Sequence, residues 1–205
     1  MTINPDQAST EFSVDGITFD IPIMASAMDA VVSPDFAKNL DDLGGIAVMN
    51  LEGIQTRYTD PDTILQEIIS ASKIEATTIL QKAYTAPIKE DLVATRVQEI
   101  KRSGSKCAVS ITPASTKRLA PVAVEAGADA VDAAMDSMSG LTSQPNLGAI
   151  AEALRNSKRN TLLNEEALRK IDIYWEEVRT IYAGFESEIR SGTADVYRHE
   201  IPGGQ

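Results

Sequence analysis

The sequence predicts an α/β protein with about four parallel strand–helix units, followed by a long C-terminal helix. Three observations predict this fold class. Short apolar runs of strand length alternate with stretches in which apolar residues recur at helical spacing. Proline and capping residues open the helical stretches, and glycine closes them. After residue 134 no strand-like run follows, and a long helical pattern begins near residue 164.

The first strand–helix unit lies near the N-terminus. Residues 14–19 predict either a short hairpin or a strand that plugs the bottom of the sheet, and the sequence leaves both open. Residues 21–26 (IPIMAS) predict a strand that is buried on both faces. Ser33 as N-cap and Pro34 at the first helical position predict a helix, which Gly44-Gly45 ends.

The second unit begins with a strand and continues into a long helical region. Residues 46–51 (IAVMNL) predict another buried strand. From Pro61 to Ser103 the pattern is helical, and Pro87 divides it before a final helix. The apolar stripe of that final helix comprises Leu92, Val93, Val97 and Ile100.

Two more strands complete the predicted sheet. Residues 107–111 predict the third strand, and residues 130–134 the fourth. Between them Ser115 opens a helix, and Gly127 closes it. Residues 146–156 predict a short helix that follows the fourth strand.

The C-terminal helix carries a narrow apolar seam. Asn164 is its expected N-cap. The seam repeats at alternating spacings of three and four, as in coiled coils, so we expect it to pack along the barrel wall or across another subunit. Its members are Leu168, Ile171, Trp175, Val178, Tyr182, Phe185 and Ile189.

Composition excludes several classes of function. The 205 residues carry a net charge of −11, so we expect neither nucleic acid nor an anionic membrane surface as a partner. The apolar runs are too short to span a bilayer, and the N-terminus does not resemble a signal peptide. One cysteine and one histidine exclude an intrachain disulfide and a multi-histidine metal centre, and a cytoplasmic location is expected.

The N-terminal part resembles the IMP dehydrogenase/GMP reductase superfamily, in particular its IMP dehydrogenase-related branch. The resemblance covers residues 15–127 approximately and rests on three motifs. They are IPIMASAMD at 21–29, GGIAVMNLEGIQTRY at 44–58 and APIK at 86–89. It implies a TIM barrel that binds purine nucleotides with NAD or NADPH, and it makes Ser26, Met28 and Asn50 nucleotide-binding candidates at the ends of strands.

The C-terminal part resembles the carboxyltransferase domain of pyruvate carboxylase and oxaloacetate decarboxylase. The resemblance covers residues 121–205 approximately. Its motifs are EAGADAVDAAMDSMSGLTSQP at 125–145, YWEEVR at 174–179 and HEIPGGQ at 199–205. The loop polar groups Asp136 and Thr142 are candidates, although turn and helix-capping roles are the simpler interpretation.

Two resemblances in one chain predict a chimera of two barrel families. We expect an IMP dehydrogenase-like half barrel over 1–130 and a carboxyltransferase-like strand and helical region over 131–205, together forming one folded unit. The expected fold is therefore a partial TIM barrel. Because a half barrel leaves two sheet edges and its inner apolar face uncovered, we expect a homodimer that closes the open sheet, or a monomer with the long helix across the open face.

The resemblances imply chemistry that this chain does not complete. IMP dehydrogenase chemistry implies a cysteine nucleophile on a mobile loop, whereas Cys107 opens a strand and is expected to be buried and inert. The carboxyltransferase resemblance implies a divalent metal held by an Asp, a His-x-His pair and a modified Lys, and biotin as carrier. His199 is the chain's only histidine, and the expected catalytic threonine lies beyond Gln205.

The predicted function is therefore that of a catalytically inactive barrel segment with a residual pocket at the barrel mouth. No catalytic residue, metal ligand or cofactor is assigned from the sequence. NAD(P), or biotin with a divalent metal, is expected only if a parent activity is retained. The alternatives are an IMP dehydrogenase-related purine nucleotide oxidoreductase and a biotin-dependent pyruvate carboxyltransferase or oxaloacetate decarboxylase.

Overall fold

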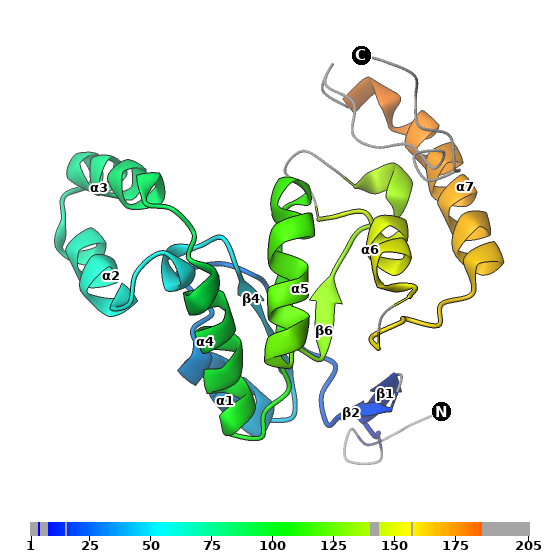
Figure 1. Cartoon of the computed structure of the whole chain (residues 1–205), viewed down its shortest axis with the longest axis horizontal. Helices are drawn as coiled ribbons and strands as arrows, with labels where there is room; N and C mark the ends of the chain where they lie inside the picture. Colours follow the sequence, from blue (N-terminus) through cyan, green and yellow to red (C-terminus); the bar gives the residue numbers. More distant parts are fainter. Residues whose placement is uncertain (1–3, 5–7, 15, 140–143, 157, 186–205) are drawn as a thin grey trace. The chain divides into compact units, whose positions relative to one another are not determined.

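The computed structural model describes residues 4, 8–14, 16–139, 144–156 and 158–185 (Figure 1). The contacts within the chain divide it into two compact units. The first comprises residues 1–110 and 121–131, and the second comprises residues 111–120 and 132–205. Across the described ranges, no helix is both long enough and apolar enough to cross a membrane.

The first unit contains a four-stranded sheet with the order β3-β4-β5-β6. Its strands are β3 (Met24–Ala25), β4 (Ile46–Asn50), β5 (Ala108–Ser110) and β6 (Ala130–Asp132). β3 and β4 run parallel with Met24 opposite Ile46, and β4 and β5 run parallel with Val48 opposite Ala108. Together with the helices, this sheet gives the mixed α/β class that the sequence predicts.

The N-terminal residues form the hairpin that the sequence left open as one of two alternatives. β1 (Phe12–Val14) pairs antiparallel with β2 (Ile17–Phe19). Gly16 lies at the turn with φ of +78°, a backbone conformation that glycine adopts without steric cost. At the end of β2, Phe19 is only 8% exposed.

Phe19 belongs to a buried apolar cluster on the sheet. The cluster also contains Ile46 and Val48 of β4 and Ala108 of β5. These three residues alternate with their neighbours along the strands, so they share one face of the sheet. The N-terminal hairpin therefore places an aromatic ring on this face of the sheet.

The predicted strand at 21–26 is shorter and more exposed than expected. Only Met24 and Ala25 form strand, and the Ile23 and Met24 side chains are 55% and 64% exposed. The expectation of burial on both faces is wrong because β3 is an edge strand of the sheet. In contrast, the four residues Ile46 to Met49 of β4 are all buried, as predicted.

The helices of the first unit begin where the sequence places their caps. These helices are α1 (Pro34–Asp42), α2 (Pro61–Ser70), α3 (Lys73–Thr85) and α4 (Glu90–Arg102). Ser33 caps α1 by accepting a hydrogen bond from the Phe36 N–H, and Asp60 caps α2 in the same way. α1 packs against both β4 and α4 (Figure 1). All four predicted stripe residues of α4 are buried.

The next helix, α5 (Thr116–Ala126), begins one residue after Ser115, as expected. It continues through Pro121. Proline cannot donate an amide hydrogen to the preceding turn, but the helix still extends to Ala126, next to Gly127, where the sequence predicts its end.

In the second unit, a 3-10 turn η4 (Asp136–Met138) precedes α6 (Leu147–Leu154) and α7 (Glu165–Ile181). A short 3-10 turn, η5 (Ala183–Phe185), follows α7. Asn146 caps α6, and Asn164 caps α7 as predicted. The predicted fourth strand ends at Asp132 rather than at Ala134, although Ala134 forms an isolated parallel bridge with Asn146.

The apolar seam of α7 is only partly buried. Leu168 and Val178 are half-buried, whereas Ile171 is 47% exposed, Tyr182 57% and Phe185 90%, and Ile189 lies outside the described residues. The only buried residue of α7 is Asp172. Packing of the seam within the chain is therefore incomplete, and its packing across another subunit stays a prediction.

The position of Phe19 predicts a large effect of its removal. We expect Phe19→Ala to lower the free energy of unfolding by about 3 kcal/mol, because the ring leaves a cavity against Ile46 and Val48. Phe12→Ala is the matched control, since Phe12 belongs to the same hairpin but is 51% exposed. Urea titration followed by circular dichroism measures both, and an equal loss in the two variants would contradict the packing role.

Candidate functional site

The nucleotide-binding candidates from the sequence lie at or shortly after the ends of β3 and β4. Ser26 is exposed, Met28 is 55% exposed, and Asn50 is half-buried at the end of β4. None of the three lines a cavity described for this structure. The Asn50 amide donates to Asp29 Oδ1 at 3.1 Å, and its carbonyl oxygen accepts from the Glu52 N–H at 2.9 Å.

Asp29 is the centre of this polar network, and sequence reasoning did not single it out. Besides Asn50, its carboxylate accepts hydrogen bonds from the Ile54 N–H at 2.8 Å and from the Tyr84 hydroxyl. Gly53 permits this approach, since a Cβ there would lie 1.6 Å from Asp29 Oδ1. The one signal in the sequence is position, because Asp29 directly follows the candidate Met28.

Tyr84 and Arg57 complete the network. The Arg57 guanidinium lies 5.2 Å from the centre of the Tyr84 ring and donates to the backbone carbonyls of Tyr84 and Ala86. Burial, and then the neighbouring Asp29 carboxylate, raise the pKa of Tyr84. These polar groups therefore bond to one another, which anchors α3 to the end of β4.

Cys107 is the buried and inert thiol that the sequence predicts. It is 0% exposed, and burial followed by the charge of Asp129 raises its pKa to about 12. Asp129 accepts a hydrogen bond from the Cys107 N–H and forms a 2.6 Å ion pair with Lys101. A thiolate therefore does not form at neutral pH.

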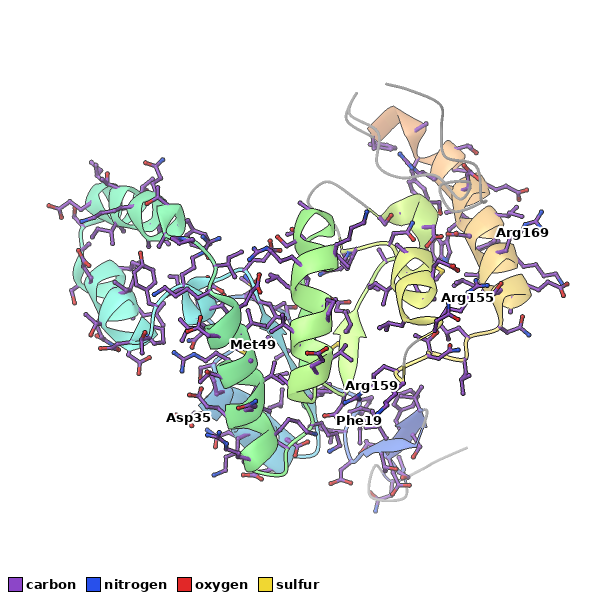
Figure 2. The ribbon with its side chains drawn as sticks, viewed as in Figure 1. Phe19, Asp35, Met49, Arg155, Arg159 and Arg169 are labelled. Atoms are coloured by element: carbon purple, nitrogen blue, oxygen red, sulfur yellow. The ribbon has the colours of Figure 1, made fainter. Side chains whose placement is uncertain are left out.

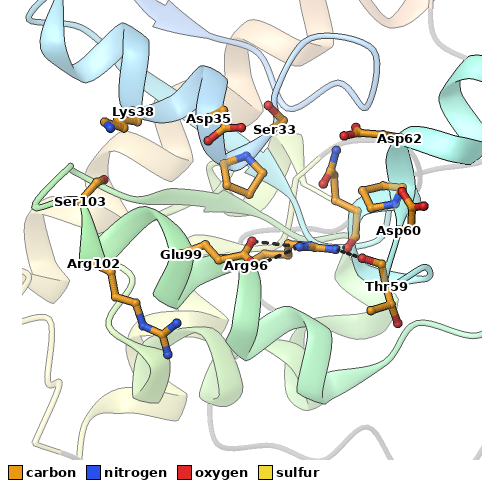
Figure 3. A pocket seen from close by; sticks show the side chains of 13 residues that line it. Ser33, Asp35, Lys38, Thr59, Asp60, Asp62, Arg96, Glu99, Arg102 and Ser103 are labelled. Carbon is orange, nitrogen blue, oxygen red and sulfur yellow. Dashed lines mark hydrogen bonds and ion pairs between the residues drawn. The ribbon is translucent and has the colours of Figure 1, made fainter.

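A polar cavity of about 620 Å³ lies where α1 and α2 begin, beside α4 (Figure 3). Charged side chains of both signs line it, among them Asp35, Lys38, Arg96 and Arg102. Arg96 is the buried member, with 9% of its surface exposed. The volume of the cavity would suit a small ligand. Whether the cavity can bind one depends on whether its charged side chains already have partners within the protein.

Arg96 is fully occupied by contacts within the protein. It donates to the backbone carbonyls of Gln55, Tyr58 and Thr59 at 2.9 to 3.2 Å and pairs with Glu99 at 2.9 Å (Figure 3). The guanidinium thereby ties α4 to the segment that leads into α2. We interpret this cavity as the surroundings of a structural arginine.

The second unit contains a pair of buried carboxyl groups. Asp136 of η4 is 6% exposed, and Asp172 of α7 is 3% exposed. Both side chains line the same cavity. The Gly148 N–H donates to Asp136 Oδ1 at 2.8 Å, and the Ser137 N–H donates to Asp172 Oδ1 at 3.2 Å. The sequence pointed to Asp136 but not to Asp172, while Thr142 lies outside the described residues.

This pair lies in the wall of a cavity of about 570 Å³. Its lining also includes Arg155, which follows α6, and Arg169 of α7, both labelled in Figure 2. Arg155 forms ion pairs with Glu152 at 2.5 Å and Glu165 at 2.8 Å. Burial, rather than the neighbouring carboxylate, is the main cause that raises the pKa of Asp136 to about 6.

The residues present do not fit the metal site that the carboxyltransferase resemblance implies. That site needs two histidines, and the chain has one. Within the ranges that the structure describes, no group of three or more His, Cys, Asp or Glu side chains could hold a metal ion. The described residues therefore do not provide the metal site of a carboxyltransferase.

Comparisons of sequence show likeness to two kinds of protein. No protein-family model matches the chain. The chain is 55% identical over 83 residues to pyruvate carboxylase 1 of Caenorhabditis elegans, which is 40% of this chain and 7% of that protein. It is 35% identical over 133 residues to an uncharacterized oxidoreductase of Mycobacterium leprae, which is 62% of this chain and 36% of that protein. The chain thus spans only a small part of either relative.

Comparisons of structure show the same two likenesses. An IMP dehydrogenase/GMP reductase-like protein from Corynebacterium glutamicum aligns with a TM-score of 0.64 and 27% identity over 75% of this chain and 42% of that chain. The carboxyl transferase domain of Rhizobium etli pyruvate carboxylase aligns with a TM-score of 0.51 and 28% identity over 89% and 28%. Both neighbours are TIM barrels, so the partial-barrel fold and the two expected resemblances are confirmed.

The arrangement around Arg96 predicts a specific loss of stability. We expect Arg96→Met to lower the free energy of unfolding by roughly 2 to 4 kcal/mol, because three backbone carbonyls lose a charged donor. Arg102→Met is the matched control, since Arg102 lines the same cavity from an exposed position. A urea titration measures both, and similar losses in the two variants would contradict a structural role for Arg96.

Proposed function

We propose that this chain is a chimeric TIM-barrel segment that joins an IMP dehydrogenase-like part to a pyruvate carboxyltransferase-like part and catalyses neither family's reaction. The observation that carries the proposal is the state of Cys107. It is the only cysteine of the chain, it is completely buried, and its thiol keeps its proton at neutral pH. A reaction that begins with a thiolate attacking a purine has no nucleophile here.

Two further observations support the absence of catalysis. A carboxyltransferase metal site needs a histidine pair, and the chain has a single histidine. At the expected barrel mouth, Asn50 and Asp29 bond to each other and to the backbone of residues 52 and 54. We propose that the mouth beside Ser26 and Met28 therefore retains only weak affinity for a purine nucleotide or a keto acid.

Each parent activity remains an alternative that one observation favours. A carboxyltransferase or oxaloacetate decarboxylase is favoured by the 55% identity to a pyruvate carboxylase over 83 residues. A purine nucleotide oxidoreductase is favoured by the TM-score of 0.64 to an IMP dehydrogenase/GMP reductase-like protein. These alternatives differ in substrate and cofactor, so one set of assays separates them.

The proposal predicts no turnover above the background of matched variants. We expect the protein to oxidise IMP with NAD no faster than Ser26→Ala does. We expect it to decarboxylate oxaloacetate with Mn²⁺ or Zn²⁺ no faster than Asp136→Ala does. Circular dichroism establishes that each variant is folded. Turnover by the unaltered protein that either substitution abolishes would overturn the proposal and identify the parent activity that is retained.

We also propose that two copies of the chain associate and close the open sheet. The support is the edge strand β3, since the side chains of Met24 in this strand and of Ile23 just before it are 64% and 55% exposed. Light scattering after size exclusion should then give twice the 22.1 kDa of the single chain. Met24→Lys should give the single-chain mass, because a charge on the edge opposes pairing. A single-chain mass for the unaltered protein would contradict this association.

A further inference from the structure

The cavity beside α1, α2 and α4 contains a buried polar side chain that has no partner. Gln55 lines this cavity and is only 3% exposed. Its backbone carbonyl accepts a hydrogen bond from Arg96, but its side-chain amide takes part in no hydrogen bond within the described residues. Every completely inaccessible side-chain nitrogen or oxygen of those residues does have a partner, so the Gln55 amide keeps its remaining contact with the cavity. A buried amide without hydrogen bonds is costly, and a molecule bound in the cavity would satisfy it.

The two charged groups in the middle of the cavity neutralise each other. Arg96 and Glu99 form the ion pair drawn in Figure 3, and the other Arg96 donors bond to backbone carbonyls. Arg96 therefore keeps its structural role and offers no donor to a ligand. The charge of a ligand depends instead on the groups at the ends of the cavity.

Groups of opposite charge lie at the two ends of the cavity (Figure 3). Lys38 and Arg102 lie at one end, Asp62 lies at the other, and Asp35 lies between them. Within the described residues, no hydrogen bond or ion pair involves the side chain of Lys38 or that of Asp62. Arg102 makes one long contact of 3.5 Å with Gln98. Both ends therefore hold charged groups that are available to a ligand.

A simple anion is a poor fit to this cavity, although two helices begin at it. The N-termini of α1 and α2 would by themselves attract a negative charge. However, the side chains of Ser33 and Asp60 already cap the two helices. Asp35 and Asp62 place a further negative charge in each first turn. A ligand that carries both signs of charge avoids this conflict, because each of its ends meets groups of the opposite sign.

We propose that this cavity binds a small zwitterion of the amino-acid class. The carboxylate of the ligand meets Lys38 and Arg102, and its ammonium group meets Asp62. The Gln55 amide hydrogen-bonds to one of these two ligand groups. The volume of about 620 Å³ admits a molecule of this size. All lining residues belong to the first unit and none is a candidate of the barrel mouth, so the inference does not depend on the proposed function.

Amide NMR of the isotope-labelled full chain tests the site. The probes are β-alanine, γ-aminobutyrate and ε-aminocaproate, which are zwitterions that differ in the separation of their two charges. We expect at least one of them to shift the side-chain amide signal of Gln55, with a dissociation constant in the millimolar range. That signal is assigned by its loss in Gln55→Met. Butylamine and butyrate each carry one of the two charges and should bind roughly twofold to fivefold more weakly. Inorganic phosphate should also bind more weakly than the zwitterion.

Matched variants show which groups bind the zwitterion, with affinities measured from the backbone amide signals of the cavity lining. Gln55→Met removes the amide, so we expect roughly threefold to tenfold weaker binding from the loss of one buried hydrogen bond. Gln66→Met is the matched control, because Gln66 is exposed on α2 and does not line the cavity. It should bind the zwitterion as the unaltered protein does.

Two exposed positions keep the test valid if Gln55→Met does not fold. Lys38→Gln and Asp62→Asn should each weaken binding roughly twofold to fivefold. Circular dichroism establishes that each variant is folded. The proposal is overturned if no zwitterion shifts the Gln55 signal, if butylamine, butyrate or phosphate binds as tightly as the best zwitterion, or if the folded variants at these positions bind as tightly as the unaltered protein.

Discussion

The architecture of the first unit depends on the burial of β4 on both of its faces. Ile46 to Met49 are all buried, so both faces of the strand are covered. α1 packs against β4, and Phe19 of the N-terminal hairpin belongs to a cluster with Ile46 and Val48. A parallel strand in a complete barrel is covered by the outer helices and by the barrel interior. Here a ring from a local hairpin supplies part of the covering.

The polar interactions of the two units follow a common rule. The charged groups described above are satisfied within the chain: the buried Arg96 by backbone carbonyls, the half-buried Asp29 by three donors, and the buried Asp136 by the Gly148 N–H. Charged side chains that already hydrogen-bond within the protein stabilise the fold and have few hydrogen bonds left to offer a substrate. Asn50 and its neighbour Asp29 show this, because their side chains hydrogen-bond to each other and to the backbone of residues 52 and 54.

Local sequence signals predicted where helices and strands begin and end. They did not predict contacts between residues that are far apart in the sequence. Ser33, Asp60 and Asn164 act as caps because their side chains bond the backbone within three residues, which the sequence alone specifies. The prediction that the strand at 21–26 is buried was wrong, because the period of apolar residues does not reveal which strand lies at an edge. The motif around Asp136 made it a candidate. Asp172, which lines the same cavity, is 36 positions away on a helix that the sequence predicts to pack through its apolar seam.

The complete burial of Cys107 makes the two units separately observable. The chain has one thiol, which lies in the first unit, and one indole, which lies in the second. A thiol reagent reaches Cys107 only when the sheet opens, whereas the indole reports on α7. The rate of thiol labelling and the emission spectrum thus follow two different unfolding events in the same protein, and they establish whether the two units unfold together or one after the other.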